Sequence, residues 1–327
     1  MNPALRLHQR VERLMGNRFE ISIVADDAGR ASALLDEAVA EISRIERLLT
    51  TYSDDSQTNR INASAGIRPV PVDAEVYRLI ERSLQLSRIT QGAFDITYGS
   101  IDKRLWNFDT TMTALPDPVT ARRMVRLINY RNVRLNPADQ SVFLVEKGMR
   151  IGFGGIGKGY AADRAKQLLR ERGVTSGIVN AAGDLTTWGN QPTGEPWTIG
   201  IADPGAHRQT SFNHAFSYLT ISDIAVATSG NYEKYALIGN KRYSHTIDPK
   251  TGFPVTGIKS VTIIAPSAEL ADALATPVMV MGVQVGLDLI NQMRGVAAIL
   301  IDDADGLHTS MNIRLRSATA NSPTTSL

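Results

Sequence analysis

Residues 151–165, IGFGGIGKGYAADRA, contain five glycines within eight positions (152–159) and continue into a run that favours a helix. Glycine leaves the backbone without Cβ atoms, so such a turn can approach a ligand closely and point N–H groups at it. The start of the following helix adds the positive end of its dipole, and Lys158 adds a full charge. The stretch predicts a cradle for phosphate groups, with a plain strand-to-helix turn as the alternative.

The same stretch nearly matches the phosphate-binding P-loop. Gly152, Gly157 and Lys158 satisfy the pattern G-x-x-x-x-G-K, but the next residue of that motif is Ser or Thr, and here it is Gly159. The preceding run 141–151 (SVFLVEKGMRI) is also not the buried apolar strand that a P-loop follows. The sequence therefore favours a different phosphate cradle, and a P-loop nucleotidase, which would bind ATP, is the remote alternative.

The first half of the chain predicts both strands and helices. Residues 18–25 (FEISIVAD) alternate as a strand does. A long helix capped near Asp26 or Asp27 should follow, because the apolar residues Leu34, Ala38, Ile42, Ile45 and Leu49 then share one face. The remaining expectations are a loop at 51–62, a second amphipathic helix at 74–89, and strands at 132–136 and 141–146.

The second half continues the mixture. A helix over 161–172 should stop at Gly173, and later helices are expected at 268–281 and 283–293. Strands are expected in GIVNAA (177–182), WTIGIAD (197–203), YLTISDIAVAT (218–228), SVTIIAP (260–266), VAAILID (296–302) and around 308–314. Strands and helices without strict βαβ alternation indicate an α+β fold. We expect one large domain at 15–316, an N-terminal extension at 1–14 and a disordered low-complexity tail at 317–327.

Composition excludes several classes of protein. The chain has 327 residues, a net charge of only +2 and no cysteine. The balanced charge argues against a nucleic-acid partner, and the absence of cysteine removes disulfides and thiolate metal sites. No run is long and apolar enough to predict a membrane span. Because the N-terminus resembles neither a signal peptide nor a lipid-attachment sequence, the chain as written is expected in the cytoplasm, or in the periplasm if its start was trimmed.

Two further stretches carry polar groups suited to chemistry. In ATSGNYEKY (227–235), Thr228, Ser229 and Gly230 offer a small anion nest, with an ordinary turn as the alternative. In RYSHTIDPKTGFPV (242–255), two prolines should stiffen a polar loop around His245. His245 is the candidate general base, with Asp248 or a backbone carbonyl fixing its tautomer.

A third stretch, SAELADALATPVMV (267–280), places a carboxylate and a hydroxyl in apolar surroundings. Asp272 and Thr276 are four residues apart, so on a helix they share a face. The pair is either a helix cap with its partner or part of a site for a hard cation. Oxygen ligands suit Mg²⁺, which commonly completes its shell with phosphate oxygens and water.

Together these stretches resemble the ApbE-type FAD:protein FMN transferases. The resemblance runs from Met15 to about Leu315, and its pieces occur in order: MGNRFEI, TYSDDSQTNRIN, GAFDITYGSIDKRLW, GFGGIGKGYAADRA, VNAAGDL, ATSGNYEKY, RYSHTIDPKTGFPV and ADALATPVMVMG. It implies an ApbE-like α+β domain with the FAD site in a central cleft. It also implies a Mg²⁺-dependent reaction in which FAD is cleaved at its pyrophosphate, FMN is attached to a Ser or Thr hydroxyl of an acceptor flavoprotein, and AMP is released.

The resemblance also implies roles for individual residues. FAD would be bound by Met15, Tyr52 (near the isoalloxazine), Ala93, Phe94, Asp95, Lys158, Thr228, Ser229, Gly230 and Asp248. Magnesium would be held by Asp272, Thr276 and the backbone carbonyl of Gly155, and His245 would be the base for the acceptor hydroxyl. The implied acceptors are subunits of a membrane quinone reductase or fumarate-reductase-like flavoproteins.

The sequence departs from the family pattern at two positions, and it leaves two alternative functions to be tested. Gly152 stands where many relatives have Asp, which puts one cofactor contact in doubt, and Ala182 stands where a second glycine is usual. An FAD pyrophosphatase would use water in place of the acceptor hydroxyl, and a flavin carrier would bind FAD without turnover. Tyr52 favours transfer because it can pack over the flavin and retain it, whereas a carrier needs neither His245 nor the Asp272–Thr276 pair.

Overall fold

The computed structural model describes residues 5–105, 114–202, 215–231, 235–238 and 241–313. The tail expected at 317–327 lies outside these residues. At the centre is an eight-stranded sheet in the order β1-β2-β6-β7-β10-β13-β14-β15, in which every neighbouring pair is antiparallel. Its strands are β1 (Arg6–Leu14), β2 (Asn17–Ala25), β6 (Gly177–Ala181), β7 (Asp184–Trp188), β10 (Ala225–Gly230), β13 (Ile258–Ala265), β14 (Ala297–Asp302) and β15 (Leu307–Thr309).

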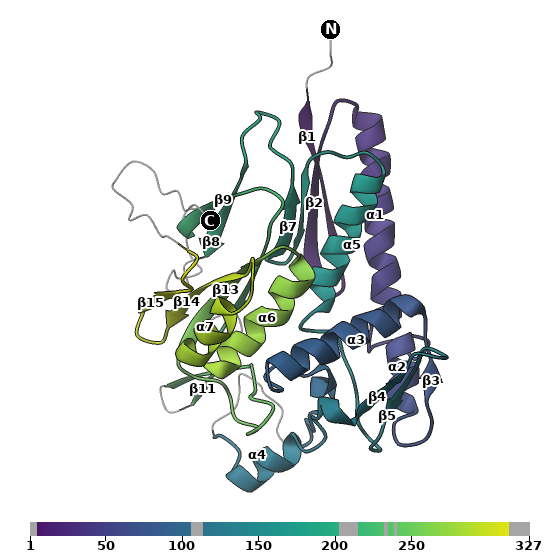
Figure 1. The fold of residues 1–327 in the computed structure, drawn as a ribbon, viewed down its shortest axis with the longest axis vertical. Helices are drawn as coiled ribbons and strands as arrows, with labels where there is room; N and C mark the ends of the chain where they lie inside the picture. The colour runs from purple at the N-terminus through teal and green to yellow at the C-terminus, as the bar shows by residue number, and fades with distance from the viewer. Residues whose placement is uncertain (1–4, 106–113, 203–214, 232–234, 239–240, 314–327) are drawn as a thin grey trace.

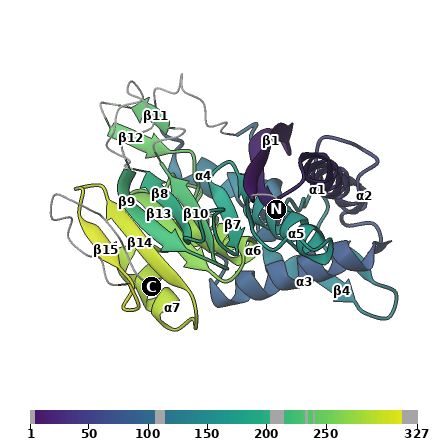
Figure 2. The same ribbon diagram turned by 90° about the horizontal axis from the view of Figure 1, so that it is seen from above.

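Helices cover one face of this sheet. They are α1 (Ala28–Leu49), α5 (Gly157–Glu171), α6 (Ala268–Met281) and α7 (Val283–Asn291), and Figure 2 shows α1 near β1 and α7 near β14, toward opposite ends of the sheet. Strand residues alternate between two apolar clusters: Ala225 and Ala227 of β10 join the main core with the helices, while Val226 joins a second cluster with β8 (Trp197–Ala202) and β9 (Ala215–Ile221). The middle of the sheet is therefore covered on both faces, which explains the nearly continuous apolar runs of β13 and β14, whereas the edge strand β1 is mostly exposed.

A smaller layer lies at one end of the long helices (Figure 1). It contains α2 (Gln57–Ala63), α3 (Ala74–Ile89), the short helix η1 (Ile96–Ser100), α4 (Pro118–Met124), η2 (Tyr130–Asn132) and a three-stranded sheet of β3 (Val70–Pro71), β5 (Ser141–Leu144) and β4 (Val133–Asn136). The hairpin of β11 (Tyr235–Ile238) and β12 (Lys241–Ser244) lies apart from both sheets. No helix within the described ranges is long and apolar enough to cross a membrane.

The α+β prediction is confirmed, and so are the elements with strong periodicity. The helix α1 follows its N-cap Asp27, whose side chain accepts a hydrogen bond from Arg30 N–H, and all five residues predicted for its apolar face are buried. The helix at 74–89 has the predicted bounds. Helices α6 and α7 also form where expected, and Gly173 ends α5 with a positive φ of 84°. Periodicity over several turns is thus enough to place a long surface helix.

Other expectations were wrong. Residues 57–63 of the expected loop form α2, because Ser56 caps the helix by accepting from Asn59 N–H. The run 218–228 is two strands that turn at Asp223, which has a φ of 56°. Residues 6–14, expected as an extension, form β1 along β2, and β7 was not predicted.

The helix α5 begins at Gly157, four residues earlier than expected, because it crosses α6 closely. A Cβ atom at Gly159 would lie 2.1 Å from the carbonyl oxygen of Ala268. A glycine in the first turn of a helix is unfavourable in isolation, but here it lets two backbones touch. Local propensity therefore gave way to tertiary packing.

Candidate active site at the glycine-rich turn

The glycine-rich turn connects the small layer to α5. Its first glycine, Gly152, donates a backbone hydrogen bond to Ile96 O at 3.0 Å, and Phe153 O accepts from Gly157 N–H at 2.7 Å. The apex is open, because a Cβ atom at Gly154 would meet nothing within 4 Å. The turn therefore leaves room for a ligand directly before the N-terminus of α5, where partial positive charge gathers.

Lys158, in the first turn of α5, reaches two carboxylates from distant parts of the chain. Its Nζ lies 2.6 Å from Oδ2 of Asp184 in β7 and 3.3 Å from Oδ1 of Asp272 in α6. The side chains of the two acids are only 7 % and 8 % exposed, and that of the lysine is 23 % exposed. We call these three residues the buried charge cluster.

The cluster perturbs its own acid–base chemistry. Burial, and next the negative charge of Asp272, raises the pKa of Asp184 to about 7, against the opposing effect of Lys158. Burial alone would lower the pKa of Lys158, but the two carboxylates raise it above its ordinary value. Two buried acids therefore share a single ammonium group, which leaves an excess of negative charge when both acids are ionised.

The helices α5 and α6 hold this cluster by capping each other. Asp272 accepts a hydrogen bond from Gly159 N–H at 3.0 Å, near the start of α5. In return, Asp163 of α5 accepts from Ala268 N–H at 3.0 Å and Glu269 N–H at 2.8 Å, at the start of α6. These bonds satisfy N–H groups that a helix start otherwise leaves free, and they fix Asp272 beside Lys158.

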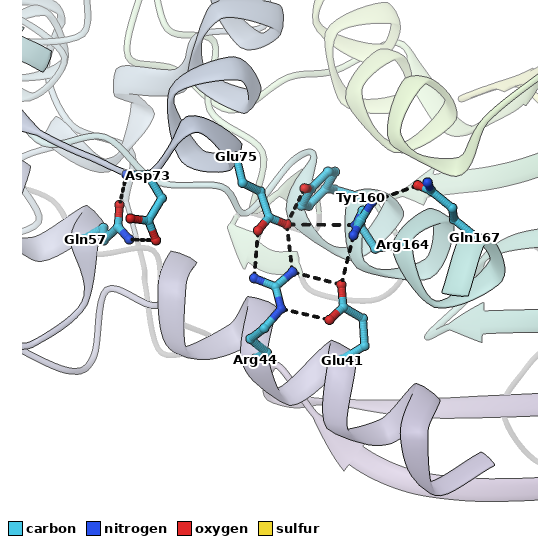
Figure 3. A network of polar contacts seen from close by, with 8 residues as sticks. All are labelled: Glu41, Arg44, Gln57, Asp73, Glu75, Tyr160, Arg164 and Gln167. Carbon is cyan, nitrogen blue, oxygen red and sulfur yellow. Dashed lines mark hydrogen bonds and ion pairs between the residues drawn. The ribbon is translucent and has the colours of Figure 1, made fainter. Parts of the chain in front are cut away.

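A charged network anchors α5 on its other side (Figure 3). Tyr160 donates to Oε1 of Glu75 at 2.5 Å, and Arg44 bridges Glu41 and Glu75 at 2.8 and 2.7 Å. The hydrogen bonds from Arg44 lower the pKa of both glutamates. The network joins α1, α3 and α5, so it fixes the helix that carries Lys158.

Hydroxyl groups lie on the sheet side of α6. Ser229 Oγ of β10 is 3.1 Å from Thr276 Oγ1, one helical turn after Asp272. Thr228 instead pairs with Thr262 across the strand ladder, with 2.9 Å between their hydroxyl oxygens. The predicted nest or turn at 228–230 is wrong as local structure, because these residues end β10 and pair with β13 up to Gly230.

Apolar side chains also border the turn. The Met15 Cε atom would lie 3.5 Å from a Cβ at Gly157, and the Phe94 ring 3.6 Å from one at Gly155. Ala93 is buried beside Phe94, whereas Tyr52 is 99 % exposed. The structure thus brings Met15 and Phe94 to the glycine-rich turn and leaves Tyr52 open to solvent.

Asp95 serves the fold. Its carboxylate accepts from Thr97 N–H at 2.8 Å, Thr97 Oγ1 at 2.6 Å and Tyr130 N–H at 2.9 Å. Burial raises its pKa despite these bonds. The carboxylate therefore joins η1 to η2, and this use was not anticipated from the sequence.

His245 is exposed and follows β12 at the base of a tight hairpin, residues 246–255. Val255 N–H donates to Thr246 O and Asp248 N–H donates to Phe253 O, both at 2.9 Å. The Asp248 carboxylate accepts from Lys250 N–H at 2.9 Å and Thr251 Oγ1 at 3.0 Å. Asp248 therefore shapes the hairpin that follows His245.

The donor set at the cluster suits a hard divalent cation. Asp272 and Thr276 share one face of α6, as predicted, and Gly155 lies in the open turn. Within the part of the chain that the structure describes, no three His, Cys, Asp or Glu side chains gather into a metal site. A cation here would take its other ligands from hydroxyl and carbonyl oxygens, water or phosphate, which is the usual pattern for Mg²⁺. The single ammonium shared by two buried acids supports that fit.

Asp184 is the site residue that sequence reasoning missed. It follows a two-residue hairpin turn in which Ala182 and Gly183 have φ angles of 55° and 101°. It lies inside VNAAGDL (179–185), one of the stretches that resemble the family pattern. The signal in the sequence is an acid directly after a glycine turn and at the start of a strand-forming run (DLTTW), because a carboxylate that becomes buried there needs a partner.

Comparisons with known proteins agree with the geometry. A model of the ApbE family matches residues 15–300. The FAD:protein FMN transferase of Treponema pallidum is 32 % identical over 91 % of this chain and 85 % of its own length, and one from Klebsiella pneumoniae is 32 % identical over 93 % and 92 %. The crystal structure of the ApbE protein of Thermotoga maritima superposes with a TM-score of 0.83 at 29 % identity, covering 94 % of this chain and 97 % of that one. The apo flavinyl transferase ApbE of Pseudomonas stutzeri gives 0.79 at 28 % identity, covering 94 % of each.

Proposed function

Because this chain belongs to the ApbE family, we propose that it is a Mg²⁺-dependent FAD:protein FMN transferase. Its substrates are FAD and an acceptor flavoprotein of the quinone-reductase or fumarate-reductase-like type. The observation that carries the proposal is the buried charge cluster at the open glycine-rich turn. A site that handles a diphosphate needs fixed positive charge and oxygen ligands side by side, and this cluster supplies both.

The proposed reaction forms one bond and breaks one. The oxygen of an acceptor Ser or Thr hydroxyl bonds to the phosphorus of the FMN half, while the bond from that phosphorus to the bridging oxygen breaks. AMP leaves with the bridging oxygen, and the hydroxyl proton passes to a base. His245 is exposed and precedes a stiff hairpin, so an approaching protein can reach it, and imidazole is the most frequent general base in proteins.

The chain's own groups would hold the diphosphate in place. Lys158 and the N–H groups of the open turn would bind its phosphate oxygens. Asp272, Thr276 and the carbonyl of Gly155 would hold Mg²⁺, which neutralises developing negative charge when bound. Asp184 would keep the ammonium of Lys158 aimed at the site, since it makes the shorter of the two contacts. Met15 and Phe94 would border the flavin, with Tyr52 free to close over it.

The experiment is mass spectrometry of an apo-flavoprotein incubated with this protein, FAD and Mg²⁺, with AMP measured in the same tube. An FMN adduct on Ser or Thr with an equal amount of AMP supports the transferase. AMP and free FMN without an adduct would identify an FAD pyrophosphatase. Bound FAD without AMP would identify a flavin carrier, and either of these two results would contradict the proposal.

A further inference from the structure

A groove with a volume of about 620 Å³ lies between α4, the start of η2 and the hairpin 246–255. Its walls include Arg122 from α4, Arg126 from the turn after it, Arg131 from η2, and Lys250 and Phe253 from the hairpin. We call it the basic groove. It is distinct from the glycine-rich turn, whose residues do not line it.

The basic groove has an excess of positive charge. Its four cationic side chains face a single acid, Asp95, which is buried and already accepts three hydrogen bonds. Arg126 pairs with Glu146 at 3.2 Å, and Arg131 lies over the ring of Tyr130 at 5.1 Å. Among the residues that the structure describes, no ion pair satisfies Arg122 or Lys250. Two charges are therefore available to a partner.

The groove is also part of the support for His245. Its wall and the hairpin pack together at Gly252, where a Cβ atom would lie 2.1 Å from the carbonyl oxygen of Ala121 in α4. At the hairpin base, the Tyr98 hydroxyl accepts from Ile247 N–H at 3.2 Å. Pro249 at the groove is four positions after His245, so their Cα atoms are at most roughly 14 Å apart. A chain lying in the groove therefore passes close to His245.

The charges of the groove suit an acidic segment. Arg122 lies in α4, and Arg126 lies in the turn directly after the C-cap Val125. Both arginines line the groove together with Lys250. Guanidinium groups bind carboxylates well, so an acidic chain that lies in the groove would meet several cations.

We propose that the basic groove docks an acidic segment of the acceptor flavoprotein and so presents the acceptor hydroxyl to His245. The inference rests on the proposed transferase function and names how its protein substrate is recognised. The contacts are exposed, so they act on encounter and affinity and weaken with salt.

The test reverses the charge of two groove residues and compares this double variant with a charge reversal at a neighbouring residue outside the groove. Arg122→Glu/Lys250→Glu changes the two cations without an ion pair, and Arg123→Glu is the matched control, because Arg123 is exposed on the same helix but does not line the groove. The first readout is fluorescence anisotropy of a labelled peptide of eight glutamates at low salt. We expect its Kd to rise at least ~10-fold in the double variant and less than ~2-fold in the control.

The second readout separates docking from chemistry. In the double variant the KM for the apo-acceptor should rise at least ~10-fold, with kcat at saturation and the Kd of FAD unchanged. An unchanged KM, or an equal loss in Arg123→Glu, would overturn the docking role. If ADP at the same concentration as the peptide displaced it, and the KM for the acceptor did not change, the groove would be a nucleotide site and not a docking site. A wild-type protein that binds the peptide through the groove but attaches no FMN refutes the transferase function instead.

Discussion

The buried charge cluster and the basic groove both concentrate charge, but in opposite surroundings. In the cluster, two acids that are 7 % and 8 % exposed share one lysine. In the groove, Arg122 and Lys250 are exposed to water. Two unit charges 4 Å apart interact by about 1 kcal/mol in bulk water and by about 4 kcal/mol at an effective dielectric constant of 20. Changes in the cluster should therefore appear in stability, and changes near the groove only in binding or rate.

Removing the shared cation should have the largest effect on stability. Lys158→Met leaves Asp184 and Asp272 without their ammonium partner, and breaking a buried ion pair costs about 3–5 kcal/mol. Urea unfolding measures this loss. The control is Lys147→Met, which removes an exposed lysine. Equal free energies of unfolding for the two variants would contradict this, because they would show that Lys158 stabilises the fold no more than an exposed lysine does.

His245→Ala should show most clearly that a change beside the basic groove affects the reaction rate and not stability. The side chain is exposed, so the free energy of unfolding should change far less than in Lys158→Met. Loss of a general base should nevertheless slow FMN transfer by about 10²–10⁴, while the Kd of FAD stays the same. The measurement is single-turnover transfer beside an FAD titration, and normal transfer would remove His245 from the reaction.

A pair of glycine variants tests whether the close crossing of α5 and α6 holds the buried charge cluster in place. Gly159→Ala places a methyl group 2.1 Å from Ala268 O, so α5 and α6 must move apart, at a cost of about 1–3 kcal/mol. Gly154→Ala adds the same group where nothing lies within 4 Å. We expect a lower Tm only for Gly159→Ala. A similar Tm for both variants would contradict this, because it would show that α5 and α6 can move apart at no cost in stability.

The pH dependence of stability tests the raised pKa of Asp184. The pKa of Asp184 is about 7 in the folded protein and ~4 in an unfolded chain, so the folded state holds the proton more tightly. Its contribution to stability is therefore lost as pH rises from about 4 to 7, with a slope of at most ~1.4 kcal/mol per pH unit. Asp184→Asn should lack this slope in urea unfolding between pH 4 and 8. Parallel curves for variant and wild type would contradict the raised pKa.

Much of the candidate site could be predicted from the sequence because its signals are local. The glycine cradle, Lys158 and the Asp272–Thr276 face each lie within a few consecutive residues. Spacing along a helix decides which of these side chains are neighbours. The unexpected part, Asp184, lies 26 residues after Lys158, and only the pairing of β6 with β7 brings it back. No periodic pattern marks such a contact.

By itself, the sequence determined the elements in which one repeating pattern dominates. The apolar stripe of α1, the cap at Asp27 and the amphipathic α3 follow from short-range spacing, because each needs only residues within the same element. Tertiary structure alone decided the early start of α5, the meeting of two acids on one lysine and the basic groove beside His245. The physical reason is that close backbone crossings and buried charges gain their energy from groups distant in the chain.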